Sequence, residues 1–262
     1  MHIRYRTSSG DQEITVCDVP ELYGEKGSFR VLQFSNEAIQ GAMDLNRPER
    51  MVFEYPRAIL HLMEINDPAF EDVFMIGHGT GMLAGRLTDK RCKVAEIDGE
   101  VVAISRAWFG YSGDNVTVGD GRQLLAEEKP HTFDYIVLDA FTEKGTPRHL
   151  TSREFFSLAR EQLDPEGAII MNLTGKGEHD PLICAIHATL DGVYAYTGAF
   201  VLPSEGAGDI RNMLLMGSAK PIRHQARSMA GFREIELQPG HVLWDISPAQ
   251  GSSSGTSCDI LE

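Results

Sequence analysis

Glycines and carboxylates follow directly after four apolar runs of this chain. The four segments read VFMIGHGTG at 73–81, KVAEID at 93–98, NVTVGDG at 115–121 and FDYIVLDAF at 133–141. Glycine tolerates positive φ and lets a ligand approach the main chain, and a carboxylate accepts hydrogen bonds from hydroxyl or amine groups. Ligands of open α/β sheets bind beyond the carboxyl ends of the strands. Four such ends together therefore predict a binding site for a small, flat polar ligand.

Each strand end has a chemical role if that ligand is an adenosine derivative. The glycine loop at 77–81 would close on the sugar and amino-acid portion, and Glu96 would accept both ribose hydroxyls. Asp120 would accept from the adenine amine, and Asp139 would face the reacting end. A dinucleotide site expects G-x-G-x-x-G before a helix, whereas this loop reads G-x-G-x-G and continues with Met82. The dinucleotide interpretation is therefore less favoured.

Alternating strands and helices must position these residues from about residue 72 onward. After the four strands above we expect strands at GAIIMNLTG (167–175), AYTGAFVLP (195–203) and RNMLLMGSA (211–219). The predicted helices are GMLAGRLT (81–88), GEVVAISRAWFG (99–110), RQLLAEE (122–128), TSREFFSLAREQL (151–163), capped by Thr151 or Ser152, and DPLICAIHATLDGV (180–193). This repetition predicts an α/β fold with a mostly parallel sheet and helices on both faces.

The first sixty residues follow a different pattern. QEITVCDV (12–19) and SFRVLQFSN (28–36) alternate apolar and polar residues as half-buried strands do, and MVFEYPRAILHLMEIN (51–66) follows as a helix or turn leading inward. We expect three parts: an N-terminal β-rich unit at 1–58, a nucleoside-binding α/β domain at 59–220, and a C-terminal extension at 221–262 whose Gly- and Ser-rich tail is disordered.

Composition argues against several classes of function. Asp and Glu outnumber Lys and Arg by 38 to 24, and a net charge of −14 disfavours nucleic acid and anionic membranes as partners. No apolar run reaches the roughly 18 residues that a membrane span needs, and the first residues lack the apolar core of a secretory signal. The four cysteines have no zinc or disulfide spacing, so we expect reduced thiols, no metal and a cytoplasmic location.

The motifs IGHGTG, AEID, VGDGRQLL and FDYIVLDAF resemble those of class I S-adenosylmethionine-dependent transferases. More narrowly, they resemble the spermidine synthase (polyamine aminopropyltransferase) family, over roughly residues 28–218, and TPRHLTSREFF is similar to the segment after that family's catalytic strand. The resemblance implies a class I methyltransferase-like (Rossmann-like) fold and a homo-oligomer, a dimer or higher. It also places Gln40 near the ligand and Tyr55 at the tyrosine of the family's YHE motif. The full predicted nucleoside site is Gln40, Gly77, His78, Gly79, Thr80, Gly81, Glu96, Ile97, Asp120, Gly121, Asp139 and Ala140.

The departures from that family concern the charges around the substrates. Thr80 replaces the loop Asp that holds the amine of decarboxylated S-adenosylmethionine, so the loop is closer to the GCGTG of methyltransferases. Thr142 replaces the second Asp of the catalytic D-x-x-D-P loop, with Glu143 one position later, and Arg57 replaces the YHE glutamate. A buried diamine needs an anion at each end, so spermidine synthesis from putrescine is not favoured. Arg57 could instead pair with a carboxylate of cofactor or acceptor, or be a solvated surface residue.

The sequence therefore predicts a spermidine synthase-like transferase that binds S-adenosylmethionine or its decarboxylated form. It would transfer an alkyl group, methyl favoured, to a small-molecule nucleophile, an amine first, with Asp139 and Tyr55 as catalytic residues. His78 is a weaker candidate for a base than for a ring packed at the cofactor. Two alternatives stay open: a polyamine aminopropyltransferase with an unusual acceptor, and a non-catalytic nucleoside-binding subunit.

Overall fold

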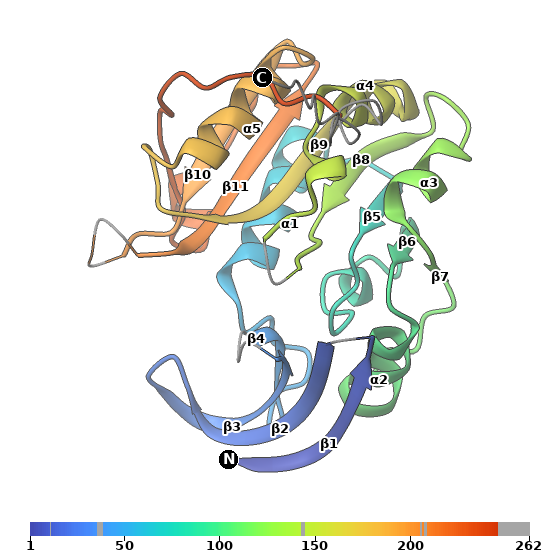
Figure 1. Cartoon of the computed structure of the whole chain (residues 1–262), viewed down its shortest axis with the longest axis vertical. Helices are drawn as coiled ribbons and strands as arrows, with labels where there is room; N and C mark the ends of the chain where they lie inside the picture. The colour runs from blue at the N-terminus through green and yellow to red at the C-terminus, as the bar shows by residue number, and fades with distance from the viewer. Residues whose placement is uncertain (11, 36–38, 143–144, 205, 207–208, 246–262) are drawn as a thin grey trace, which may run out of the picture.

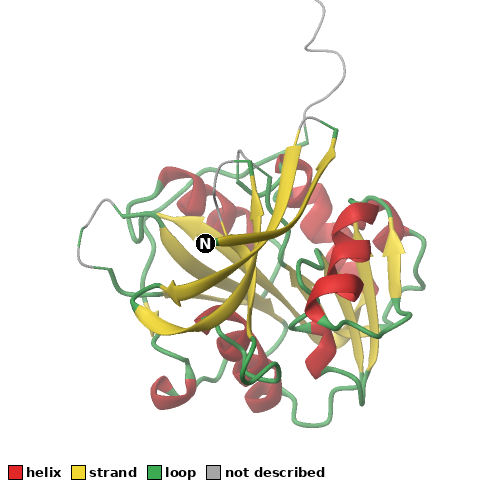
Figure 2. Cartoon of the chain, turned by 90° about the horizontal axis from the view of Figure 1, so that it is seen from below, coloured by secondary structure: helices red, strands yellow, loops and turns green. Residues whose placement is uncertain are grey.

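The computed structural model describes residues 1–10, 12–35, 39–142, 145–204, 206 and 209–245 and contains two sheets (Figure 1). The smaller sheet is antiparallel, with strands in the order β1-β2-β3-β4. Its strands are β1 (His2–Ser9), β2 (Gln12–Leu22), β3 (Glu25–Phe34) and β4 (Ile39–Asp44). Figure 2 shows these strands in front of the rest of the chain when the molecule is seen from below.

The larger sheet has eight strands in the order β12-β10-β11-β9-β8-β5-β6-β7. The parallel strands are β5 (Asp72–Ile76), β6 (Arg91–Glu96), β7 (Val116–Val118), β8 (Phe133–Leu138) and β9 (Leu163–Gly175). Strands β10 (Tyr196–Val201), β11 (Arg211–Ser218) and β12 (Arg233–Glu234) are antiparallel to their neighbours. Strand β5 lies between β6 and β8, so the chain order reverses there, and such a switch point is where doubly wound sheets bind ligands.

Helices cover both faces of this sheet, which confirms the predicted fold class. The helices are α1 (Glu54–Asn66), α2 (Gly99–Phe109), α3 (Gly121–Ala126), α4 (Arg153–Gln162) and α5 (Pro181–Asp191). Helix α1 packs on one face, with Ile59 and Leu62 against Val137 and Ile170. Helices α4 and α5 pack on the other, where Phe155 and Ile186 join the core. No helix of the described residues is long and apolar enough to cross a membrane.

Helix α2 connects the two sheets. Its Val101, Ile104 and Phe109 form a buried cluster with residues of the smaller sheet, Ile14, Val16, Leu32 and Met43. Burial of these apolar side chains holds the N-terminal sheet against the carboxyl edge of the larger sheet.

Several helices begin at side chains that accept the free N–H groups of the first turn. Asp98 accepts from the Glu100 amide at α2, Asp120 from the Gln123 amide at α3, and Asp180 from two amides at α5. At α4 the cap is Ser152, which accepts from the Phe155 amide. Such caps stabilise a helix start by about 1 kcal/mol.

The predicted helix at 81–88 is wrong in extent. Only the 3-10 turn η1 (Ala84–Arg86) forms there. Gly81 has φ +79°, outside the helical region, and Gly85 adds a second poor helix former within four residues. The segment at 51–66, expected as a helix or turn, contains helix α1, which begins at Glu54, and the expected domain boundary at residue 58 falls inside this helix.

The end of the described chain packs on the larger domain. Strand β12 pairs with β10, and Leu243 is buried, with its N–H donating to Thr189 Oγ1 at 2.8 Å and its C=O accepting from Arg153 N at 2.8 Å. The Arg122 guanidinium then makes two hydrogen bonds, of 2.9 and 2.7 Å, with the Asp245 carboxylate. These contacts hold residues 243–245 beside α3 and α4.

Candidate active site

The glycine loop after β5 allows two strand ends to approach closely. Gly77 has φ +99°, and a Cβ built on it would lie 2.0 Å from the carbonyl oxygen of Asp139 at the end of β8. Gly79 and Gly81 also have positive φ, at +54° and +79°. Only glycine fits the first position, because any side chain would collide with backbone rather than with a movable group.

Glu96, at the end of β6, holds this loop in place. Its Oε2 accepts from the His78 amide at 2.8 Å, and its Oε1 accepts from the Asp98 amide at 3.0 Å. Burial raises the pKa of Glu96, and the hydrogen bonds from Asp98, His78 and Gly79 oppose that rise. The residue predicted to bind the ribose therefore also binds the backbone of the loop, and each carboxylate oxygen has a second lone pair for a ribose hydroxyl.

His78 turns its ring away from the reacting end. The Nε2 atom lies 2.8 Å from Ser105 Oγ of α2, and the ring makes an edge contact with Tyr111, with centroids 4.5 Å apart. The side chain is 8% exposed, and Nδ1 is buried without a hydrogen-bond partner. Burial, helped by the nearby Arg106 charge, lowers the pKa of His78 to about 4. A neutral ring packed under the loop fits the structural role rather than that of a base.

This depressed pKa predicts a pH-dependent loss of stability. In the unfolded chain His78 takes up a proton near its ordinary pKa of 6.5, whereas the folded ring stays neutral down to about 4. Lowering the pH through this window therefore favours the unfolded state, by roughly 2 kcal/mol between pH 7 and pH 5. Urea denaturation at pH 7 and pH 5 should show this difference in the free energy of unfolding of the native chain. In His78→Gln the contribution of His78 to that difference should be absent. An equal pH dependence in the two proteins would contradict the prediction.

The next two strand ends offer an apolar surface and a carboxylate. Ile97 after β6 is 70% exposed, and Val118 at the end of β7 is 55% exposed. A Cβ built on Gly99 would lie 3.8 Å from Val118, so the two strand ends are close together. Gly121 lets α3 approach β5, because a Cβ there would lie 2.4 Å from Ile76 Cγ2. Exposed aliphatic side chains at a strand edge are suited to the face of a flat base.

Asp120 is shared between a helix start and a histidine. Its Oδ1 accepts from the Gln123 amide at 2.9 Å, and its Oδ2 lies 2.9 Å from His149 Nε2. The carbonyl of His149 in turn accepts from Arg122, which also binds Asp245. Sequence reasoning missed His149, because only the fold brings residues 120 and 149 together.

Asp139 is the carboxylate at the centre of the arrangement. The half-buried side chain accepts from Asn172 Nδ2 of β9 at 2.8 Å and interacts with the Tyr55 hydroxyl at the start of α1. Burial raises the pKa of Asp139, and hydrogen bonds from Asn172 and Tyr55 oppose that rise. The pKa of Tyr55 lies well above its ordinary value, because of burial and the Asp139 charge. The two residues predicted as catalytic thus lie together, and Ala140 follows Asp139 in the loop after β8.

The N-terminal sheet reaches the glycine loop through β4. A Cβ on Gly79 would lie 3.6 Å from the Gln40 carbonyl oxygen, and one on Gly41 would lie 2.3 Å from Thr80 Cγ2. Thr80 is buried in this contact. The Thr80 side chain therefore helps to join the two sheets at the position where the resembling family has a carboxylate.

The remaining residues singled out by the sequence lie at the surface or outside the described chain. Arg57 is exposed, and its guanidinium lies 3.4 Å from Glu54 one turn earlier and donates to the Phe53 carbonyl, which fits the solvated alternative. Thr142 forms an isolated bridge with Gly145. Glu143 lies outside the described residues. Within those ranges, no group of three or more His, Cys, Asp or Glu is arranged to hold a metal ion.

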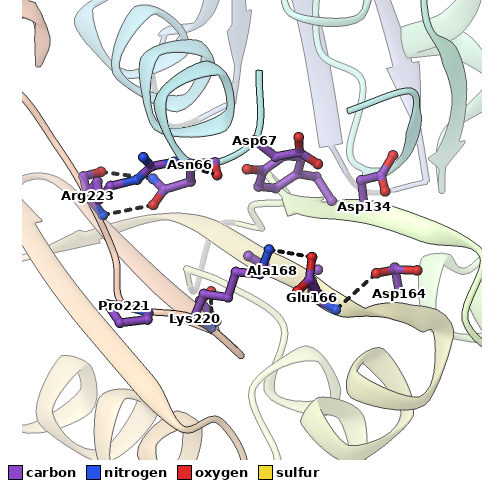
Figure 3. Close-up of a pocket in the computed structure, with 12 residues that line it drawn as sticks. Asn66, Asp67, Asp134, Asp164, Glu166, Ala168, Lys220, Pro221 and Arg223 are labelled. Carbon is purple, nitrogen blue, oxygen red and sulfur yellow. Dashed lines mark hydrogen bonds and ion pairs between the residues drawn. The ribbon is translucent and has the colours of Figure 1, made fainter. Parts of the chain in front are cut away.

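A separate cavity of about 340 Å³ lies at the other edge of the sheet (Figure 3). It is lined by the end of α1 at Asn66 and Asp67, the start of β8 at Asp134 and the segment with Lys220. The charged groups there are already bound: Asp134 accepts from the Glu71 and Asp72 amides, and Lys220 pairs with Glu166. Because its lining includes the amino ends of β8 and β9, this cavity is separate from the site at the carboxyl ends.

Comparisons with known proteins identify the family of this chain. The family model described as the spermine/spermidine synthase domain matches residues 52–214, well over half of the chain. The chain belongs to this family. The family and the transferase class predicted from the sequence are thereby confirmed.

Relatives of this spermidine synthase-like chain include two kinds of transferase. The polyamine aminopropyltransferase of Neisseria meningitidis serogroup A is 26% identical over 211 residues, which cover 77% of this chain and 78% of the relative. Putrescine N-methyltransferase 2 of Nicotiana tabacum is 28% identical over 128 residues, which cover 45% of this chain and 36% of the relative. The crystal structure of a probable spermidine synthase from Corynebacterium glutamicum shares the fold, with a TM-score of 0.76 at 20% identity, covering 98% of this chain and 100% of the other.

Proposed function

We propose that this chain binds a sulfonium nucleoside of the S-adenosylmethionine type and transfers one of its alkyl groups to an amine. The observation that carries the proposal is the Asp139 carboxylate at the switch point of the sheet, next to Gly77 and bound by Asn172. A carboxylate at that position can bind an ammonium group and accept the proton that it loses on reaction.

The described residues fit the nucleoside on three counts. In the loop at 77–81, Gly77 and Gly79 are partly exposed and have no side chain, which leaves their backbone open to a ligand. The exposed Ile97 and Val118 offer an apolar surface for the adenine face, and Asp120 offers an acceptor for its amine. Glu96 lies at the adjoining strand end, where a ribose would follow.

In the proposed reaction the amine nitrogen forms a bond to carbon as the carbon–sulfur bond breaks. The bound nucleoside supplies the electrophilic carbon. Asp139 orients the amine and accepts its proton, and the contacts from Tyr55 and Asn172 fix the direction of the carboxylate. Positioning of this kind supplies much of the rate of a displacement reaction.

An aminopropyl group is the first candidate for the transferred group. The relative named polyamine aminopropyltransferase covers 77% of this chain, whereas the putrescine N-methyltransferase covers 45%. Methyl transfer, which the sequence alone favours, is the second candidate because of Thr80. That side chain is buried against Gly41 and provides no carboxylate for the donor amine of a decarboxylated nucleoside.

Calorimetric titration with S-adenosylmethionine and with its decarboxylated form tests the proposal and separates the two candidates. We expect the decarboxylated form to bind more tightly if the chain transfers aminopropyl, and the intact form if it transfers methyl. The mass of the product formed with a mixture of small amines then identifies the group. Binding of neither nucleoside would contradict the proposal. It would also contradict the alternative of a non-catalytic nucleoside-binding subunit.

The role proposed for Asp120 predicts a selective loss of affinity. Asn at this position keeps the helix cap, since Asn and Asp cap about equally well, but it loses the charge that strengthens a hydrogen bond to the adenine amine. S-adenosylhomocysteine should bind Asp120→Asn about tenfold more weakly, as calorimetry would show. Asp180→Asn is the matched control, because Asp180 caps α5 in the same way and is not one of the predicted nucleoside-binding residues. Equal losses in the two variants would assign the effect to capping alone.

A further inference from the structure

Two side-chain amides, the buried one of Asn172 and the half-buried one of Asn212, form a chain that ends on the Asp139 carboxylate. Asn172 of β9 is 1% exposed, and its Nδ2 donates to Asp139 Oδ1 at 2.8 Å. On its other side, Asn172 Oδ1 accepts from Asn212 Nδ2 of β11 at 3.0 Å. Each end of the Asn172 amide therefore has one protein partner, and the two partners lie on different strands.

The register of the sheet makes this chain of contacts possible. Leu138 pairs with Met171 in the parallel ladder of β8 and β9, so the next residues, Asp139 and Asn172, lie side by side. Asn172 pairs with Leu214 across the antiparallel ladder of β9 and β11, and Asn212 is therefore its diagonal neighbour on the same face. That face is the one covered by α1, from which Tyr55 also approaches Asp139.

An asparagine amide has a donor end and an acceptor end, and rotation of the group exchanges them. With the donor end toward Asp139, the amide stabilises a carboxylate, whereas with the carbonyl end toward Asp139 it would repel the charge. Asn212 favours one choice, because its Nδ2 donates to the Asn172 carbonyl, and the Asn172 amide can then turn only if the Asn212 amide turns with it. We propose that Asn212 is a positioning residue that fixes the Asn172 amide so that its N–H always faces Asp139.

This inference rests on the proposed function, in which Asp139 binds the acceptor amine and takes its proton. The other groups around Asp139 do not replace the two amides. From α1 the titratable neighbour is Tyr55, from β5 the neighbour is Gly77, which has no side chain, and His78 is turned toward Ser105. Among the described residues around Asp139, the Asn172 amide is therefore the group whose donor and acceptor ends can exchange by rotation.

A double-mutant cycle in the ligand-free full chain tests the inference. The protein is labelled with ¹³C at the aspartate carboxyl carbons, and the Asp139 signal is assigned by its absence from Asp139→Asn. Asn172→Leu should move the midpoint of the Asp139 titration upward by about one pH unit, because a donor to the carboxylate is lost. Asn212→Leu should give part of that displacement, and the double variant no more than Asn172→Leu alone. The inference is overturned if Asn212→Leu leaves the midpoint unchanged, or if its effect adds in full to that of Asn172→Leu.

Asn212→Asp provides a second measurement if a leucine variant fails to fold. A carboxylate at 212 can only accept, so it competes with Asp139 for the Asn172 N–H. Thr174→Asp is the matched control for charge, because Thr174 is exposed on β9 directly opposite Asn212. The Asp139 midpoint should rise further in Asn212→Asp than in Thr174→Asp, and equal displacements would overturn the inference. Since these titrations need no nucleoside, a failure of the proposed function would appear separately, as absent binding in calorimetry.

Discussion

Asp139→Asn is expected to lower kcat for the transfer by a factor of about 10² to 10⁴, the range typical for loss of a positioned acid or base. Asparagine has nearly the same shape and can still contact Asn172 and Tyr55, but it cannot accept the proton of the amine. Most of the predicted nucleoside contacts lie at the other three strand ends and asparagine keeps the shape of the side chain at 139, so calorimetry should show an affinity for S-adenosylhomocysteine close to that of the native chain.

The pH dependence of the native chain supplies a second readout for Asp139. Because burial raises the pKa of Asp139, the carboxylate becomes protonated at a higher pH than an ordinary aspartate as the solution is acidified. Its contribution to kcat/KM is present above that pKa and lost below it, and this loss should be missing from Asp139→Asn. Asp89→Asn, at an aspartate that is 74% exposed, is the control. A kcat within threefold of native in Asp139→Asn would assign proton transfer to another group.

The strand ends of this site were predictable because each combines two local signals. An apolar run followed at once by glycine or a carboxylate indicates both a buried strand and a break in it, as at Ile76-Gly77 and Leu138-Asp139. The structure places all four of these ends at one edge of the larger sheet, around the switch point between β5 and β8.

The residues that support the site were not predictable in the same way. Asn172 is one polar residue within the run AIIMNLTG. It lies 33 positions after Asp139 in the chain, and their contact depends on the register between β8 and β9. His149 reaches Asp120 only through the turn η2 (Arg148–Leu150). Strand β1 was missed although Ile3 and Tyr5 alternate with Arg4 and Arg6, because two apolar residues form too short a pattern to indicate a strand.

The glycine loop shows where sequence reasoning stops at the level of a single side chain. The pattern correctly indicated a turn with backbone freedom, but it could not decide which way His78 points. That direction depends on Ser105 and Tyr111, which belong to the next helix and the loop after it. The same loop shows why a helix was wrongly expected from Gly81: the apolar residues have helical spacing, but the positive φ of Gly81 makes the first turn impossible.

Gly77→Ala is expected to destabilise the fold by an amount on the order of 3 to 5 kcal/mol, in the upper range for single substitutions. Two costs combine: φ +99° is strained for alanine, and the new Cβ would lie 2.0 Å from the Asp139 carbonyl oxygen. Backbone must move to relieve that contact, so β5 and β8 would separate at the site itself. Urea denaturation measures the loss of stability, and calorimetry should show that nucleoside affinity falls with it.

Gly85→Ala separates these causes from the general effect of replacing a glycine. Gly85 lies in η1, four residues after the loop, has no positive φ, and a Cβ there would meet no atom within 4 Å. Alanine at that position should leave stability within about 1 kcal/mol of native, or raise it slightly, because it restricts the unfolded chain. If Gly77→Ala were as stable as Gly85→Ala, the close approach of the two strand ends would not be required by the fold. The glycine at 77 would then have to be explained by the ligand, as a position where any side chain would block the nucleoside.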